Sequence, residues 1–288
     1  MPLISCNSEM ASELRGVHLF HNGASQCSQR VRLGLAEKGV TYVSHHLDLR
    51  KGEHLRAWYA QLNPNLVVPT LVHDGQVIIE SNDIISYIDS QFDGLALMPE
   101  SAAGAAGARR WLALSDRCKS AIRVLSFEYL FRNFARKSAT QLERLRELSG
   151  DDGELYRFHR RYVEEGLSHE EVGRSISEFR VVLAQMEDAL GDAPWLLGGD
   201  VSLADIAWLC DVHRLAWMRF PLGDYPRVGG WYERWQARPS FREAVREFEP
   251  LHMRLFLRLQ GGMRDRLGRG PRSWTSQAQV AVVPGSQS

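Results

Sequence analysis

Residues 17–32 read VHLFHNGASQCSQRVR, and this stretch decides the predicted fold of the first part of the chain. The apolar run 17–20 predicts a short buried strand, and the Asn-Gly pair at 22–23 predicts the turn that ends it. Residues 25–38 place apolar side chains near helical spacing, and Gly39 stands where a left-handed C-cap belongs. We therefore expect a strand that leads directly into a helix.

The elements that follow complete the order of a known kind of domain. Residues 40–49 alternate as a second strand, and a strand–helix–strand unit implies a parallel pair with a right-handed crossover. A helix is expected over 53–62, where an Asn-Pro pair ends it. Two short strands then flank an Asp-Gly turn at 74–75, and residues 81–92 form another helix. The order β-α-β-α-β-β-α is that of a thioredoxin-like domain.

The rest of the chain predicts helices alone. Residues 111–247 carry helical periods without a strand signal, after a small-residue stretch at 101–108. We therefore expect an α+β fold. Its predicted divisions are a flexible leader over 1–15, a thioredoxin-like domain over 16–95, an all-α helical-bundle domain over 101–250, and a basic amphipathic segment with a disordered tail over 251–288.

Composition and charge exclude several classes of function. Lys+Arg and Asp+Glu are equal at 35 each among 288 residues, so no global field favours nucleic acid. The first residues lack the basic head and apolar run of a secretory signal, and no apolar stretch is long enough to span a membrane. The four cysteines are scattered without metal-ligand spacing, so we expect no metal and a reducing cytoplasm.

The turn at the start of the first long helix is the first candidate for chemistry. A helix N-terminus exposes unpaired backbone N–H groups and about half a positive charge, and both favour an anion. A hydroxyl of Ser25 or Ser28, or the thiol of Cys27, can donate to a bound thiolate, and Cys27 can itself become one. The simpler alternative is that Ser25 only caps the helix and Cys27 packs as a small apolar group.

Two further signals lie downstream in the same predicted domain. Val68-Pro69 opens a strand, and a cis bond there would turn the backbone of Val68 toward a bound peptide. Glu80 and Ser81 precede a helix, where the carboxylate would take an ammonium group and the hydroxyl a carboxylate. The alternatives are an ordinary strand-initiating proline and a plain N-cap.

The order and spacing of these signals resemble the glutathione transferase family. The stretch SQCSQRVR at 25–32 looks like the Ser-x-Cys-x-x-Arg-Val-Arg signature of zeta-class isomerases and their relatives. The Asn-Pro, Val-Pro-Thr-Leu and Glu-Ser elements that follow look like the family's cis-proline and γ-glutamyl elements. Residues 206–208, Arg214 and a long insertion in the helical part are most similar to tetrachlorohydroquinone dehalogenases and the plant proteins named after them. The resemblance covers roughly residues 17–247.

The resemblance implies that glutathione is the co-substrate, and it assigns roles by position. Ser25 would activate the glutathione thiol, with Cys27 and Ser28 as competitors in the same turn. In the dehalogenases, the position of Cys27 carries the thiol that resolves a glutathione–substrate conjugate. The implied glutathione contacts are Val68 and Pro69 at the cysteinyl backbone, Glu80 and Ser81 at the γ-glutamyl end, and Lys51 or His54 near the glycyl end.

Residues 199–206, GDVSLADI, resemble the helix-capping segment of the family. Ser202 would cap a helix while Asp205 reaches back to it as a capping box. Val201 and Ile206 are placed as the hydrophobic staple of that helix. We assign this segment no chemistry.

An electrophile site in the helical domain should be apolar with a few polar contacts. Arg123 or Arg214 could meet an acidic or phenolic group there, and the alternative for the aromatic residues is simple core packing. The candidate lining residues are Trp111, Arg123, Phe127, Tyr129, Phe131, Trp208, Arg214 and Trp217.

Residues 251–269 mix apolar and arginine side chains. Such a basic amphipathic segment could rest on an anionic membrane surface, or it could fold back on the domain as a last helix. The tail beyond Gly270 has the composition of a disordered segment.

Together these features predict a glutathione-dependent transferase that directs the thiolate at an apolar or aromatic electrophile, by conjugation, dehalogenation or ether cleavage. The alternatives are a thiol-transferase or reductase based on Cys27, a glutathione-dependent isomerase, and a non-catalytic module that binds a membrane or a partner. This chain has Trp217 where the zeta isomerases carry an arginine, which disfavours the isomerase. By resemblance we also expect a cytoplasmic homodimer, with peripheral membrane contact as a variant, in detoxification or aromatic catabolism.

Overall fold

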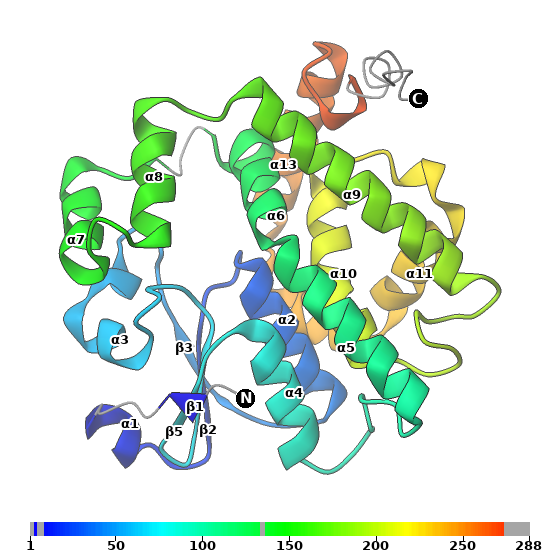
Figure 1. The fold of residues 1–288 in the computed structure, drawn as a ribbon, viewed down its shortest axis with the longest axis horizontal. Helices are drawn as coiled ribbons and strands as arrows, with labels where there is room; N and C mark the ends of the chain where they lie inside the picture. Colours follow the sequence, from blue (N-terminus) through cyan, green and yellow to red (C-terminus); the bar gives the residue numbers. More distant parts are fainter. Residues whose placement is uncertain (1–2, 5–8, 133–135, 274–288) are drawn as a thin grey trace, which may run out of the picture.

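The computed structural model describes residues 3–4, 9–132 and 136–273. Its N-terminal part holds a five-stranded sheet with helices on both faces, and every later element described is helical (Figure 1). The predicted α+β fold is therefore confirmed. No helix of this described part is long and apolar enough to cross a membrane.

The sheet has the predicted parallel pair and hairpin. Its strands β1 (Leu3–Ile4), β2 (Val17–His21), β3 (Val43–His46), β4 (Thr70–His73) and β5 (Gln76–Ile78) lie in the order β1-β5-β4-β2-β3. Strands β2 and β3 are parallel, and the remaining neighbours are antiparallel. The hairpin turns at Asp74 (φ 48°) and Gly75 (φ 84°), both in the left-handed region that a two-residue type I′ turn requires.

Alternate residues of the strands enter two different cores. Leu19 and Leu71 face the large core that α2 (Gln26–Glu37) and α4 (Ser81–Gln91) share with the helical part. Phe20 and Val72 face the opposite side, where α3 (Ala57–Leu62) covers them. The two-residue period of the strands therefore separates the layers.

The helical part surrounds α10 (Leu203–Trp217), in which every residue from 203 to 215 is buried. Helix α2 packs directly on α10 and on α12, so the two parts of the chain share one interface. The other long helices are α5 (Ala102–Arg117), α6 (Lys119–Ser126), α7 (Ala139–Ser149), α8 (Glu154–Glu164), α9 (His169–Leu190), α11 (Pro226–Ala237), α12 (Pro239–Ala244) and α13 (Leu251–Arg266). Short turns of helix are η1 (Glu53–Leu55), the π-helical η2 (Phe127–Phe131), η3 (Leu222–Asp224), η4 (Arg246–Phe248) and η5 (Pro271–Ser273).

The predicted capping box at the start of α10 is confirmed. Asp205 Oδ2 accepts from the backbone N–H of Ser202 at 3.0 Å and from its hydroxyl at 2.6 Å. The other carboxylate oxygen accepts from Leu196 N and from Trp231 Nε1, each at 2.9 Å. Asp205 therefore joins three segments, because a buried carboxylate is stable only where its oxygens are satisfied.

The prediction of a flexible leader over 1–15 is wrong for residues 3–4 and 9–13, which form a strand and a helix. Strand β1 pairs with β5, and α1 (Glu9–Glu13) packs on the sheet with Ala11 only 1% exposed. The partly buried side chains of Met10 and Leu14 join the same core. These few apolar residues were too sparse to show a period, yet they cover an open face of the sheet. The rest of the leader, at 1–2 and 5–8, lies outside the described residues.

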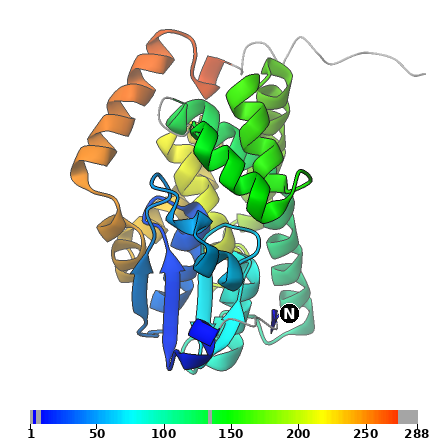
Figure 2. The same cartoon turned by 90° about the vertical axis from the view of Figure 1, so that its left-hand side faces the viewer.

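The last helix, α13, forms over the predicted amphipathic segment and runs along the outer edge of the helical part (Figure 2). It is anchored by Leu257, which is 5% exposed, and by Arg264, which donates to the backbone oxygens of Glu128 and Tyr129. The prediction of a disordered tail beyond Gly270 is wrong for residues 271–273, which form η5, and residues 274–288 lie outside the described residues.

Candidate active site

The turn between β2 and α2 presents unpaired donors. Ser25 is the N-cap of α2, and its side-chain oxygen accepts from the Ser28 N–H at 3.3 Å, which leaves the hydroxyl proton free to donate. Within the described residues, no acceptor pairs with the backbone N–H of Gln26 or Cys27. These are the first two N–H groups of the helix, so they point where an anion is favoured.

Two buried arginines donate hydrogen bonds to the backbone carbonyls of the same turn. Arg32 donates to Asn22 O and Gly23 O, each at 3.2 Å, and Arg214 donates to Ala24 O at 2.5 Å. Arg32 is 1% exposed and Arg214 is 3% exposed. Three successive carbonyls therefore face guanidinium groups, which fixes the turn and places positive charge behind it.

A third arginine joins the turn to four helices through a buried ion pair. Arg30 Nη2 lies 2.8 Å from Asp211 Oδ2 of α10, and Gln26 Nε2 donates to the other oxygen of Asp211 at 2.5 Å. Arg30 also donates to Ser81 Oγ of α4 and to Ser115 Oγ of α5, each at 2.9 Å. Burial alone would lower the pKa of Arg30, but the Asp211 carboxylate and other nearby acidic groups raise it above its ordinary value.

The local charge favours an anion in front of the turn. Three guanidinium groups, those of Arg30, Arg32 and Arg214, are accompanied by the buried carboxylates of Asp211 and Glu249. Three positive and two negative charges leave an excess of one positive charge. This excess and the positive end of α2 would both favour an anion over a neutral group in front of the turn.

The sequence did not point to Arg30, Arg32, Gln26 or Asp211 as functional residues. A signal for Asp211 was present, because a carboxylate within an otherwise apolar helix must be buried against a partner. The partner itself could not be found, since Arg30 and Asp211 are separated by 181 residues.

The bond between Val68 and Pro69 is cis, as predicted. The loop before it is held by Tyr59 and Asn63, whose side chains donate to Val67 O at 2.7 and 2.9 Å. Within the described residues, no hydrogen bond engages the backbone N–H or C=O of Val68. Both groups are therefore free to pair with a peptide ligand.

Glu80 and Ser81 stand where the cleft meets α4. Glu80 has a left-handed backbone (φ 65°), and its carboxylate accepts from Asn65 at 3.0 Å and from Lys119 of α6 at 2.6 Å. Ser81 is 2% exposed, and its hydroxyl accepts from Arg30. Of the predicted glutathione contacts, Ser81 is thus joined to α2 through Arg30, and Glu80 is joined to α6 through Lys119.

The prediction that Ser28 competes for the sulfur is wrong. Its side chain is fully buried, and its hydroxyl accepts from the backbone N–H of Asn22 at 3.3 Å. Helix α2 is buried on all sides from Ser28 to Leu35, so a serine one turn from the N-cap points into protein. Cys27 stays half-buried, whereas Cys118 and Cys210 are buried.

The prediction that Trp208 lines the electrophile site is also wrong. Trp208 is 0% exposed, and its indole N–H donates to Trp111 O at 3.1 Å. The rings of Trp111 and Trp208 pack edge to face at 5.9 Å, so both belong to the contact between α5 and α10.

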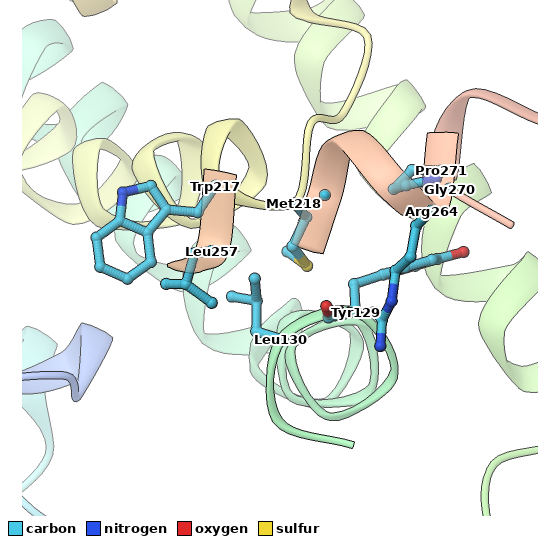
Figure 3. A pocket seen from close by; sticks show the side chains of 9 residues that line it. Tyr129, Leu130, Trp217, Met218, Leu257, Arg264, Gly270 and Pro271 are labelled. Atoms are coloured by element: carbon cyan, nitrogen blue, oxygen red, sulfur yellow. Dashed lines mark hydrogen bonds between the residues drawn. The ribbon is translucent and has the colours of Figure 1, made fainter. Parts of the chain in front are cut away.

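The remaining electrophile candidates lie near the turn. The Arg214 guanidinium lies 5.3 Å from the Phe131 ring and 5.9 Å from the Trp217 ring, and the Phe127 ring is 6.0 Å from that of Phe131. Figure 3 shows Trp217 beside Leu257 of α13, opposite Leu130 and Tyr129 of η2. Tyr129 is 5% exposed, so it contributes to the core more than to a site.

Three predicted residues, one electrophile candidate and two glutathione contacts, lie apart from the turn. Arg123 Nη1 pairs with Glu154 at 2.7 Å and its guanidinium lies over Phe158. Lys51 is exposed, with its Nζ 3.7 Å from Asp48, whereas His54 is buried against α7 and α8. Within the described part of the chain, no group of three or more His, Cys, Asp and Glu could hold a metal ion.

Two family models match the chain. The glutathione S-transferase N-terminal domain matches residues 24–91, and the glutathione S-transferase C-terminal domain matches residues 170–234. These segments contain the α2 turn, the cis-proline, Glu80 and Ser81, and the buried helix α10. The chain belongs to the glutathione S-transferase family.

Individual relatives agree with this membership. The tetrachloro-p-hydroquinone reductive dehalogenase of Sphingobium chlorophenolicum is 26% identical over 238 residues, which cover 79% of this chain and 95% of the relative. Glutathione S-transferase 1 of Dianthus caryophyllus is 39% identical over 90 residues, and that match spans only 31% of this chain and 41% of the relative. The crystal structure of the β-etherase LigF from Sphingobium sp. strain SYK-6 superposes with a TM-score of 0.70 at 25% identity, covering 80% of this chain and 99% of that chain.

Proposed function

We propose that this glutathione S-transferase-like enzyme binds glutathione with its sulfur at the N-terminus of α2 and directs the thiolate at an activated carbon of an apolar or aromatic electrophile. Family membership makes glutathione the co-substrate. A C–S bond forms, and the bond to the leaving group breaks with its electron pair. Halide and aryloxide leaving groups are the two classes to screen first, because the relatives include a reductive dehalogenase and a β-etherase.

The observation that carries this proposal is the set of donors around Ser25. A free thiol has a pKa near ~8.5, and lowering it by about 2 units requires about 2.7 kcal/mol of preference for the thiolate. A hydrogen bond to a charged group contributes about 1.5–3 kcal/mol, and a helix N-terminus adds about 0.3–1 kcal/mol. The Ser25 hydroxyl, two unpaired N–H groups and the excess positive charge are together sufficient.

The remaining glutathione contacts are part of the same proposal. The free backbone groups of Val68 would pair with the cysteinyl unit, as in β-strand addition. Glu80 and Ser81 would hold the γ-glutamyl end, with Lys119 positioning the carboxylate of Glu80. Lys51 or His54 would lie near the glycyl end, as the family resemblance implies.

Cys27 supports a second candidate function. It is a half-buried thiol in the first turn of α2, beside the unpaired backbone N–H groups of that turn. In this alternative, Cys27 attacks a mixed disulfide of glutathione and acts as a thiol-transferase or reductase. A Cys27→Ser variant that keeps full conjugating activity but loses disulfide reduction would assign the two activities to different residues.

The cellular context is a further proposal. Family members usually dimerise, so we infer a cytoplasmic homodimer that acts in detoxification or aromatic catabolism. Sedimentation velocity of the full chain gives the oligomeric state directly. A glutathione-dependent isomerase, or a non-catalytic module, becomes the better account if glutathione binds but no electrophile is conjugated.

Helix α13 supports peripheral contact with an anionic membrane. Six large apolar side chains, five on α13 and one at the residue that follows it, are more than half exposed: Leu251, Leu255, Phe256, Leu259, Met263 and Leu267. Arg254 and Arg258 flank this face beside a groove of about 430 Å³ between α10 and α13. An apolar face with flanking arginines suits an anionic lipid surface.

The test of membrane contact is sedimentation with vesicles of phosphatidylserine and phosphatidylcholine. Leu259, which is 75% exposed, is replaced by Glu so that the buried anchors of α13 stay intact. Binding that falls in Leu259→Glu, but not in a Val181→Glu control on exposed α9, supports the proposal. Equal sedimentation of all variants contradicts it.

A further inference from the structure

Helix α13 and the end of α10 enclose a groove of about 430 Å³. Helix α10 contributes Ala216 and Trp217, and α13 contributes Leu251, Leu255 and Leu257. Figure 3 shows Trp217 beside Leu257, where the two helices meet. Sites for small molecules in proteins typically have volumes of about 300–1,000 Å³. The groove is therefore large enough for one small molecule with an apolar body.

The side of α13 that lines the groove follows from the spacing of its residues. Leu251, Arg254, Leu255 and Arg258 stand at positions i, i+3, i+4 and i+7, so they share one face of the helix. The other large exposed apolar residues of this region follow a second stripe: Phe256, Leu259, Met263 and Leu267. None of these four lines the groove. Helix α13 therefore has an apolar and basic face toward the groove and a separate apolar face outside it.

The groove carries uncompensated positive charge. Among the described residues that line it there are four arginines and no carboxylate: Arg219, Arg246, Arg254 and Arg258. Arg219 Nε lies 2.6 Å from Asp265 Oδ2, and Arg246 donates to Gln236 Oε1 at 3.3 Å. Arg254 and Arg258 form no hydrogen bond or ion pair with any described residue. Residues 1–2, 5–8, 133–135 and 274–288 contain no Asp or Glu that could pair with them.

The chemistry of the groove favours an anion with an apolar chain. Arg254 is half-buried, and a partly desolvated guanidinium is best satisfied by a carboxylate or a similar anion. The leucines alternate with the arginines along the same face, and Leu251 and Leu255 are 61% and 51% exposed. An inorganic anion would leave this apolar surface in water, whereas an alkyl chain would cover it. One molecule that carries both groups satisfies both features.

We propose that this groove binds a fatty carboxylate, with the head group between Arg254 and Arg258 and the alkyl chain on Trp217, Leu251 and Leu255. Of the candidate electrophile residues, only Trp217 lines the groove. The site is therefore distinct from the α2 turn, and the inference does not depend on the chemistry proposed there.

The first test is isothermal titration of the full chain with decanoate and with decan-1-ol, which differ in the head group. Wild type should bind decanoate about 10- to 100-fold more tightly, as expected for hydrogen bonds between charged groups. Octanoate should bind about 4- to 15-fold more weakly than decanoate, because each buried methylene contributes up to about fourfold. Equal affinity for decanoate and decan-1-ol refutes the inference.

Variants locate the binding. In the double variant Arg254→Gln/Arg258→Gln, the Kd for decanoate should rise about 10- to 100-fold, while that for decan-1-ol changes less than about twofold. Arg266→Gln, an exposed arginine of α13 outside the groove, is the matched control and should bind both as wild type does. Leu255→Glu should abolish decanoate binding, and Leu259→Glu on the other face should not. If Leu259→Glu weakens it as much, decanoate covers the outer face and the inference is wrong.

Other occupants of the groove give different results. Displacement of decanoate by S-hexylglutathione would place it in the electrophile site and refute the inference. Absence of decanoate binding to wild type also refutes it. A dimer that Arg254→Gln/Arg258→Gln dissociates in sedimentation velocity would then identify a second copy as the occupant. Loss of vesicle sedimentation in that variant would identify a membrane surface. Far-UV circular dichroism and the melting temperature confirm that each variant is folded.

Discussion

At the scale of single residues, Lys137 is a partly buried amine that forms no hydrogen bond or ion pair with any described residue. Lys137 is held at the junction of η1, α7 and α8, where burial lowers its pKa to about 8 from an ordinary value of 10.5. Replacing it should therefore stabilise the free protein, in contrast to most substitutions.

The stability change at Lys137 has a defined pH dependence. The folded pKa lies below the unfolded one, so between about pH 8 and 10.5 the unfolded chain binds more protons and stability rises with pH. Below pH 8 the full cost is present, so Lys137→Met should raise the free energy of unfolding there by about 2–3 kcal/mol. Urea unfolding at pH 7 and pH 10 measures the difference, which should shrink at the higher pH. A lower stability of Lys137→Met at pH 7 would contradict this.

The sequence could predict that a residue faces the site only where its position in the backbone, such as a helix cap, fixes its direction. Ser25 as N-cap follows from local chemistry. The cis bond before Pro69 does not, because an ordinary strand-initiating proline fits the same local sequence and only the resemblance to the family favoured the cis form. Ser28 and Trp208 were misplaced because α2 and α10 are buried on every side. A helix without a polar face gives no period that shows which side turns to the ligand.

At the scale of elements, the ion pair between Arg30 and Asp211 aligns α2 with α4, α5 and α10. Removing one partner of a buried pair leaves an unpaired buried charge, which typically costs about 3–5 kcal/mol. Asp211→Asn should therefore lower the free energy of unfolding by that amount and loosen the N-terminus of α2, because Gln26 also loses an acceptor.

Urea unfolding measures this loss, and Asp188→Asn on the exposed face of α9 is the matched control. The control should change stability by less than about 0.5 kcal/mol. Glutathione affinity should fall in Asp211→Asn alone. If both variants unfold at the same urea concentration, Arg30 is satisfied without Asp211 and the pair does not position the turn.

The π-helical turn η2 could not be predicted from the sequence. Residues 127–131 fit an ordinary helical period, and nothing local signals the wider hydrogen-bond pattern. This turn places Phe127 against His159 and Phe131 against Arg214.

At the scale of the whole molecule, the two parts of the chain depend on each other. Leu33 and Leu35 of α2 belong to the same buried cluster as Leu203 and Trp235 of the helical part. Glu37 of α2 accepts from two nitrogens of Arg238, at 2.8 and 2.6 Å. The order of elements was predictable from sequence, since strand, turn and cap signals are local. This shared core was not, because it joins residues about two hundred positions apart.

A fragment of residues 1–95 should therefore fail to fold on its own. It would expose the apolar face of α2 and α4, and the buried guanidiniums of Arg30 and Arg32 would lose their partners in the helical part, Asp211 and the backbone oxygen of Ala244 among them. Thermal unfolding followed by circular dichroism should show no cooperative transition for the fragment. A sharp transition, with glutathione binding like that of the full chain, would show that the N-terminal part is independent.

The central claim is that Ser25, backed by the α2 N-terminus, ionises the glutathione thiol. The measurement is the ultraviolet thiolate absorbance difference on adding glutathione, followed across pH for wild type, Ser25→Ala and Cys27→Ala. We predict a thiolate signal at neutral pH in wild type and Cys27→Ala, and an apparent pKa raised by about 1–2 units in Ser25→Ala. A signal that persists unchanged in Ser25→Ala and disappears in Cys27→Ala would contradict the account and assign the chemistry to the cysteine.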